Sequence, residues 1–110
     1  MDDLTKEQKH LIVSMYKEML LRSRQSAMSL DEAKHFDNSD IVKDLFCPSQ
    51  TSEYVSDLCW TLQSKGYIEC YPGDDLANEI SITDKTIIYM ENRCKNGLKD
   101  VISFLASLIP

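Results

Sequence analysis

The side chains best able to do chemistry in this sequence are its four cysteines and two histidines. Thiolates and imidazoles bind zinc or serve as nucleophile and base, but both uses depend on short, regular spacings. The cysteines are Cys47, Cys59, Cys70 and Cys94, and the histidines are His10 and His35. These positions do not have the close spacing of zinc or redox motifs. We therefore expect free thiols, buried as small apolar side chains, and no metal site.

Sequence motifs for catalysis or cofactor binding are also missing. The chain has no glycine-rich phosphate loop and no serine or cysteine nucleophile motif. Two acidic segments, 37–40 and Asp74–Asp75, have the composition of cation sites, but a helix cap and a turn explain them more simply. We predict that the protein is not an enzyme and holds no cofactor.

Length and composition indicate one globular domain. The 110 residues are 43% hydrophobic and 27% charged, which is the balance of a folded rather than a disordered chain. No apolar run approaches the roughly 20 residues of a membrane span, and the acidic start Met1–Asp3 is unlike a signal peptide. We expect a cytoplasmic protein with no membrane contact. Its net charge of −6 opposes binding to polyanions unless basic residues gather locally.

The elements that must position these side chains begin with a long helix. Thr5–Gln8 has the form of a capping box, and apolar residues recur at helical spacing over 11–20. We expect this helix to reach about Arg24. The pattern weakens over 26–38, which allows one further helical turn and a short strand at His35–Phe36.

Two shorter helices follow. We expect Ser39 to cap the first, which ends at Pro48, and Thr51 or Ser52 to open the second. Gly66 stands where a left-handed C-terminal cap belongs, because glycine takes this conformation without steric cost. The inward residues are expected to be Ile41, Val42, Leu45 and Phe46 in the first helix, and Val55, Leu58, Cys59 and Leu62 in the second.

After these helices the spacing changes to alternation. Tyr67–Tyr71 and Glu79–Ile82 alternate apolar and polar residues on either side of the turn cluster Pro72–Asp75, which predicts a β-hairpin with one buried face. A further helix is capped at Thr83–Asp84, and a final apolar helix covers 98–110. The fold class is therefore mainly α with a small β-hairpin.

This order of elements is that of the winged helix-turn-helix. Residues 53–58 and 62–68 resemble the third helix and first wing strand of many bacterial winged-helix proteins, and Ile82–Lys85 resembles the segment that closes the wing. More narrowly, the layout resembles the small phage-associated YjcQ-type winged-helix proteins of Gram-positive bacteria, which carry an extra C-terminal helix. The resemblance implies a winged-helix domain at 1–96 and an added packing or dimerisation helix at 97–110.

Winged-helix proteins commonly place the third helix in the major groove and the wing against the backbone. The outward positions of the third helix are expected to be Glu53, Ser56, Asp57, Trp60, Thr61 and Gln63, and the wing comprises Tyr71, Pro72, Gly73, Asp74 and Asp75. Only Gln63, with Ser and Thr, suits the reading of bases, and arginine is absent. Trp60 is either an exposed anchor for a protein partner or packs on the preceding helix or the tail.

The charges on this predicted face disfavour DNA. Residues 53–82 contain one cation, Lys65, against six acids, which leaves a net charge of −5. Each acid near a phosphate repels where a lysine would attract. Residues 4–28 have the opposite balance, with five cations and two acids. Such a run is usually a solvated face, and the alternative is an unconventional surface for nucleic acid or an acidic partner.

The last helix is unusually apolar for its length. Its apolar residues are Val101, Ile102, Phe104, Leu105, Leu108 and Ile109. They either pack on the first helix within the monomer or pair across a two-fold dimer, and we favour the dimer. A helix lying on a membrane surface fits less well, because its polar side offers only Lys99, with Asp100 beside it.

The sequence thus predicts a non-enzymatic, dimeric winged-helix module of the transcription-regulator type. We expect its acidic third helix and wing to contact a protein partner. The alternative is a conventional DNA-binding regulator that contacts DNA through basic surfaces outside the third helix.

Overall fold

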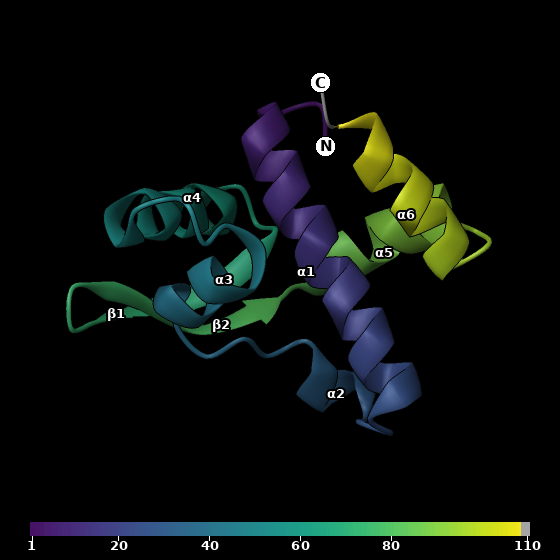
Figure 1. Ribbon diagram of the computed structural model, residues 1–110, viewed down its shortest axis with the longest axis horizontal. Helices are drawn as coiled ribbons and strands as arrows, with labels where there is room; N and C mark the ends of the chain where they lie inside the picture. The colour runs from purple at the N-terminus through teal and green to yellow at the C-terminus, as the bar shows by residue number, and fades with distance from the viewer. Residues whose placement is uncertain (109–110) are drawn as a thin grey trace.

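A long first helix runs through the middle of the molecule in the computed structural model, which describes residues 1–108 (Figure 1). The described chain is mainly helical, with one two-stranded antiparallel hairpin, as the sequence predicts. Its elements are α1 (Lys6–Gln25), α2 (Leu30–Ala33), α3 (Ser39–Phe46), α4 (Ser52–Ser64), β1 (Ile68–Gly73), β2 (Leu76–Ile82), α5 (Asp84–Arg93) and α6 (Leu98–Ser107). No helix within this range is long and apolar enough to cross a membrane.

The first helix begins at the predicted capping box. Gln8 N donates to Thr5 Oγ1, and Thr5 N donates to the Gln8 side chain. Further along, Ile12, Val13 and Met15 are completely buried. Helical geometry points these side chains in different directions around α1. All three are nevertheless buried, because α3, α4 and the hairpin lie on one side of α1 and α5 and α6 lie on the other (Figure 1). This helix therefore supplies core to two groups of elements.

The C-terminal half of α1 also holds residues 33–36 in place, within the segment 26–38 whose sequence pattern is weak. The Arg22 guanidinium donates to the carbonyls of His35, at 2.7 Å, and Ala33, at 3.4 Å, and lies 4.3 Å from the centre of the Phe36 ring. Next to it, Phe36 N donates to Ile80 O at 2.8 Å. The predicted short strand at 35–36 is thus present as an isolated antiparallel bridge against β2.

The hairpin is longer than the sequence predicts. Ile68 pairs with Ile82 and both are buried, which gives the hairpin its expected buried face, but Pro72 and Gly73 belong to β1 rather than to the turn. The turn itself is Asp74–Asp75, with φ of +51° and +61°. Positive φ at both turn residues gives the twist that a two-residue hairpin loop requires, and Asp tolerates it better than most residues. The strand pairing can therefore continue to the loop.

The short helix α3 differs from the prediction in two ways. Its cap is Asn38, whose side-chain oxygen accepts from two backbone N–H groups, and Ser39 is buried inside the first turn. Ile41 and Leu45, predicted to face inward, are 41% and 47% exposed. An eight-residue helix packs through one stripe, and here that stripe includes Val42 and the half-buried Phe46.

The junction between α4, β1 and α5 is tied by threonine hydroxyls. Gly66 has the predicted left-handed conformation, with φ of +86°. The next residue, Tyr67, accepts two side-chain hydrogen bonds at its carbonyl oxygen, from Thr83 at 3.1 Å and from the buried Thr86 at 2.7 Å. In α4, Val55, Cys59 and Leu62 face the core as predicted, whereas Leu58 is only half-buried. These bonds fix the hairpin against the start of α5.

Replacement of Arg22 by methionine should destabilise the protein by about 2 kcal/mol, because two carbonyls lose a charged donor while the apolar stem is kept. The matched control is Arg24→Met, since Arg24 is exposed and should change stability by no more than about 0.5 kcal/mol. Urea unfolding followed by circular dichroism measures both. Equal effects of the two substitutions would contradict the role given to Arg22.

Candidate functional site

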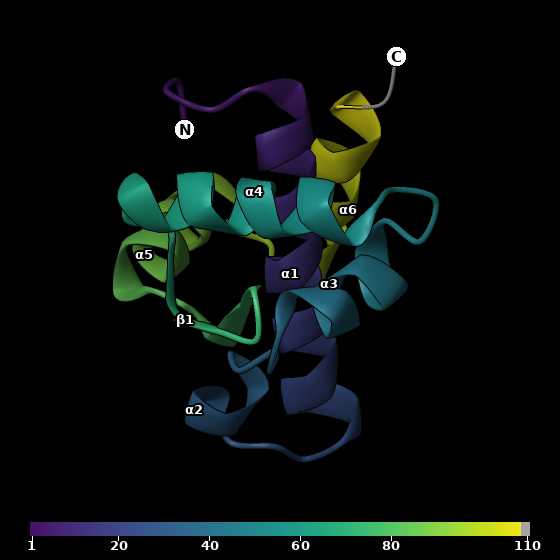
Figure 2. The ribbon, with the colours of Figure 1, turned by 90° about the vertical axis from the view of Figure 1, so that its left-hand side faces the viewer.

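Six acidic residues of α4 and the hairpin are exposed, and we call this set the acidic face. It consists of Glu53, Asp57, Glu69, Asp74, Asp75 and Glu79, all of them exposed. The two elements lie side by side, because α4 packs on both strands (Figure 2). The negative charge counted in the sequence of α4 and the hairpin is therefore carried by exposed side chains in the folded protein.

The basic residues beside this face are held by other parts of the chain. The Lys65 ammonium donates to the Asp3 backbone carbonyl, and the Lys85 ammonium donates to the Lys65 carbonyl at 2.7 Å. The Tyr67 hydroxyl donates to the Asp3 carboxylate at 2.6 Å. Burial and this bond raise the pKa of Tyr67 to about 12, and the same bond lowers the pKa of Asp3. Lys65 is thus directed toward the N-terminal segment.

The structure separates the predicted outward residues of the third helix into three groups. Glu53 and Asp57 are exposed, while Trp60, Thr61 and Gln63 are half-buried. The prediction for Ser56 was wrong, because it is buried at 5% exposure. Ser56 adds to the buried side formed by Val55 and the other apolar residues of α4. That side is therefore wider than the apolar residues alone predict.

The one predicted base-reading residue has a structural use. The side-chain oxygen of Gln63 accepts hydrogen bonds from Cys70 N and from Cys70 Sγ, each at 2.9 Å. Cys70 lies where the register shifts between Glu69 and Tyr71, so its N–H is available to a side chain. Gln63 therefore joins α4 to β1, and its amide oxygen is not available to the edge of a base.

The wing residues are presented to solvent around one aromatic side chain. Tyr71 is 56% exposed, and Pro72, Asp74 and Asp75 are exposed as well, whereas Gly73 is half-buried. The half-buried Trp60 shares a shallow hollow with residues 72–76. Trp60 is also packed against the hydrophobic core. Tryptophan and carboxylates in one hollow suit a cationic group.

Two residues at the base of the hairpin were not predicted to belong to this surface. Asp37 and His35 line a second hollow together with Glu69, Tyr71, Glu79 and Ser81. The His35 Nδ1 lies 2.5 Å from Ser81 Oγ across the isolated bridge. The only signal in the sequence was the weak strand at 35–36, which places Asp37 beside β2. The acidic face thus gains a seventh neighbouring carboxylate.

The cysteines and histidines do not assemble into a reactive centre. Cys59, Cys70 and Cys94 are buried free thiols, and Cys47 is half-buried. Burial raises the pKa of Cys59 to about 12 and that of Cys70 to about 11, which suppresses the thiolate. Over residues 1–108, no three His, Cys, Asp or Glu side chains are placed to hold a metal ion.

The basic first helix provides a weaker charge cluster than its sequence indicates. Arg22 bonds to backbone carbonyls and lies 4.0 Å from Glu18. Lys9 and Lys17 are half-buried, and only Lys6 and Arg24 are exposed. The cations are therefore spread along α1 rather than concentrated in one patch.

The apolar tail packs within the monomer. The α6 helix lies against α1, with Val101 completely buried and Phe104, Leu105 and Leu108 packed on the core. The Arg93 guanidinium also covers the Phe104 ring at 4.0 Å. Ile102 remains 49% exposed, and Ile109 lies outside the described residues. Most of the apolar residues of the tail therefore pack on the same chain, which was one of the two expectations; the other was pairing across a dimer.

Comparison of the chain with protein-family models, curated proteins and solved structures finds no match. The function must therefore be inferred from the geometry. Six exposed carboxylates, together with the exposed Tyr71 and the half-buried Trp60, are suited to bind positively charged groups.

We expect a thiol reagent such as Ellman's reagent to modify one cysteine per native chain, because only Cys47 is not fully buried. Burial also raises the pKa of Cys47, so its rate should be below that of free cysteine and should increase with pH. Absorbance counts the thiols before and after unfolding in urea. Modification of the native Cys47→Ser variant at a similar rate would contradict this assignment.

Proposed function

We propose that this chain is a non-enzymatic winged-helix module that binds a basic surface of a protein partner through the acidic face. The observation that carries the proposal is the set of six exposed carboxylates on α4 and the hairpin, with Lys65 directed toward the N-terminal segment. Charged surfaces of this kind speed association and select partners of opposite charge.

The winged-helix part of the proposal is supported by the order and pairing of elements. A long helix, two helices joined by a short turn and a hairpin follow one another, and His35 forms an isolated antiparallel bridge with Ser81 of β2. The narrower resemblance to YjcQ-type proteins rests on the sequence segments 53–68 and 82–85 and on the additional helix α6. A role in transcriptional regulation is inferred from this resemblance alone.

A protein partner is favoured over DNA for two reasons. Phosphate contacts supply most of the affinity for DNA, and here the corresponding surface repels phosphates. The residues that would read bases are also few, because Gln63 is bonded to Cys70 and Ser56 is buried. Trp60 and Tyr71, in contrast, are of the types that dominate protein–protein contacts.

The full-length protein should bind a labelled random-sequence DNA duplex more weakly than about 10⁻⁴ M at physiological salt, which is the weak end of non-specific binding. Fluorescence anisotropy over a salt series measures this. Tight binding that weakens steeply with salt would contradict the protein-partner proposal, since that slope reports displaced counterions.

Charge reversal tests whether the acidic face has the geometry of a winged-helix DNA surface. The variant Glu53→Lys/Asp57→Lys/Glu69→Lys should bind the same duplex at least about tenfold more tightly at low salt than a control with the same net charge. The control is Glu7→Lys/Asp31→Lys/Glu91→Lys, whose three residues are also exposed. Equal binding by the two variants would count against the winged-helix assignment.

We also propose that the protein forms a homodimer, with Ile102 on the exposed side of α6 at its centre. Light scattering should then give twice the chain mass, and Ile102→Asp should give a monomer. The control is Ile88→Asp, because Ile88 on α5 is equally apolar and 58% exposed. These substitutions are cleaner than deletion of 97–110, which would uncover the core residues of α1 that α6 covers. A monomeric full-length chain would rule out the dimer.

A further inference from the structure

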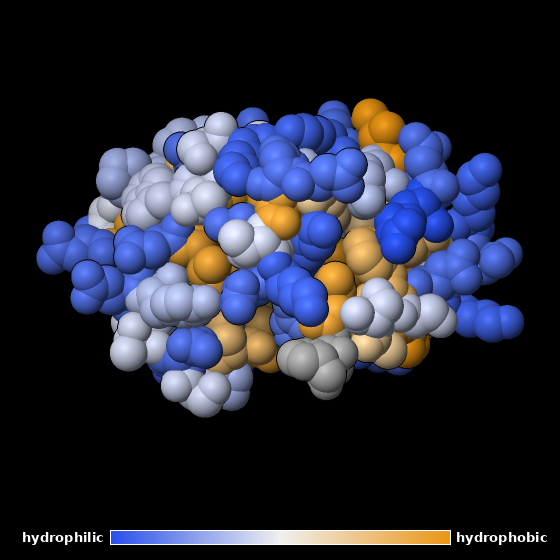
Figure 3. Space-filling view, turned by 90° about the horizontal axis from the view of Figure 1, so that it is seen from above, coloured by the Kyte–Doolittle hydropathy of each residue, from blue (hydrophilic) through white to orange (hydrophobic). Residues whose placement is uncertain are grey.

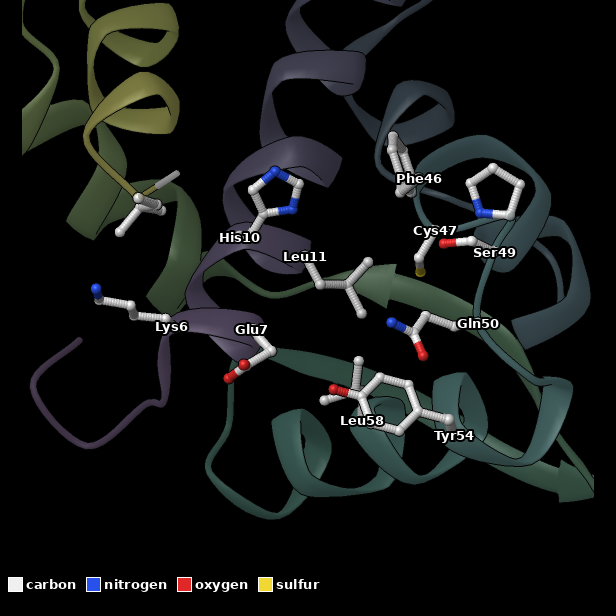
Figure 4. Close-up of a pocket in the computed structure, with 12 residues that line it drawn as sticks. Lys6, Glu7, His10, Leu11, Phe46, Cys47, Ser49, Gln50, Tyr54 and Leu58 are labelled. Carbon is white, nitrogen blue, oxygen red and sulfur yellow. The ribbon is translucent and has the colours of Figure 1, made fainter. Parts of the chain in front are cut away.

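A cavity of about 400 Å³ lies between the first turns of α1, the connection from α3 to α4, the first half of α4 and Leu108 at the end of α6 (Figure 4). It is separate from the acidic face. Tyr54 and Leu58, which line it, are each one residue after Glu53 and Asp57, and successive helical residues point about 100° apart. The cavity and the acidic face therefore occupy different sides of α4.

The walls of this cavity are mainly apolar. Leu11 from α1, Phe46 from α3 and Leu58 from α4 converge on it, and all three are packed on the core. Figure 3 looks onto the start of α1 and the end of α6 and shows several hydrophobic residues at the surface between hydrophilic ones. Apolar lining of this kind provides the hydrophobic contribution to ligand binding, and its volume is in the usual range for small-molecule sites.

A few polar groups surround this apolar surface. His10, Gln50 and Tyr54 each bring a polar side chain to the cavity, and Figure 4 shows the Gln50 amide directed toward Leu11 and Leu58. No hydrogen bond within residues 1–108 engages these three side chains, so they are available to a ligand. The fully charged residues of the lining are one lysine and one glutamate, Lys6 and Glu7, whose charges cancel.

We propose that this cavity binds a small, uncharged molecule with a body of one to three rings and one hydrogen-bonding edge. The apolar walls select the rings, and the polar groups on α1 and the α3–α4 connection orient the polar edge. A charged ligand would lack a counter-charge here, since Lys6 and Glu7 compensate each other. A peptide is disfavoured because the space of about 400 Å³ between α1, the α3–α4 connection, α4 and Leu108 after α6 has the size of a small-molecule site.

The probe for this site is N-phenyl-1-naphthylamine, an uncharged three-ring amine that fluoresces in apolar surroundings. Titrated against the full-length native protein, it should bind saturably with one site per chain. Bound probe should also slow the modification of Cys47, which lines the cavity, by at least threefold. Non-saturable binding, or binding that leaves the Cys47 rate unchanged, would overturn the proposal.

Two matched substitutions locate the probe. Leu58→Trp fills the cavity and should weaken binding at least tenfold, whereas Leu45→Trp makes the same change at a position that is 47% exposed and outside the lining. Circular dichroism and urea unfolding establish that each variant is folded. If Leu58→Trp does not fold, Gln50→Trp in the exposed connection replaces it, with the same expected loss. Equal binding by the filling variant and Leu45→Trp would overturn the proposal.

A second probe tests whether the cavity prefers an uncharged ligand to a charged one. The sulfonate 8-anilinonaphthalene-1-sulfonate has the same three-ring body with one negative charge added. Both probes are measured at a salt concentration high enough to screen the net charge of −6. The neutral probe should bind at least tenfold more tightly. Equal or tighter binding of the sulfonate would show that the cavity does not select an uncharged ligand and would overturn that part of the proposal.

Discussion

The burial of α1 on more than one side is the constraint on which the other elements depend. Ile12, Val13 and Met15 are completely buried, although they point in different directions around the helix. Protein interiors are close-packed, so the elements on each side of α1 cannot shift independently of it. At its C-terminal end, Arg22 holds the carbonyl of His35, and the adjacent strand residues pair with β2. The position of the hairpin thus follows from that of α1.

The function inferred for this arrangement depends on which residues occupy its surface. A winged-helix geometry would bring α4 and the hairpin to one side of the molecule, where most DNA-binding members carry cations. Here the same side carries carboxylates such as Asp57 and Asp74, with Trp60 beside them. A fold alone does not fix a function, and the charges and aromatic side chains decide the kind of partner.

Predictions from the sequence succeeded where a feature is encoded by a few neighbouring residues. The capping box at Thr5, the left-handed Gly66 and the buried face of the hairpin with Ile68 and Ile82 all depend on local chemistry or on alternation. Predictions failed where a helix surface had to be divided into buried and exposed sides. Leu45 is exposed because short α3 packs through one stripe, and Ser56 is buried because its side of α4 is covered.

The sequence by itself determined the element types, the small apolar thiols and the opposite charges of residues 4–28 and 53–82. Only the tertiary structure decided that Arg22 and Gln63 bond within the protein, that Trp60 lies beside the hairpin turn, and that the apolar side of α6 packs on α1. It also formed the cavity from four segments of the chain. The physical reason is the range of the interactions. Caps, turns and charge counts depend on adjacent residues, whereas these contacts depend on how whole elements pack.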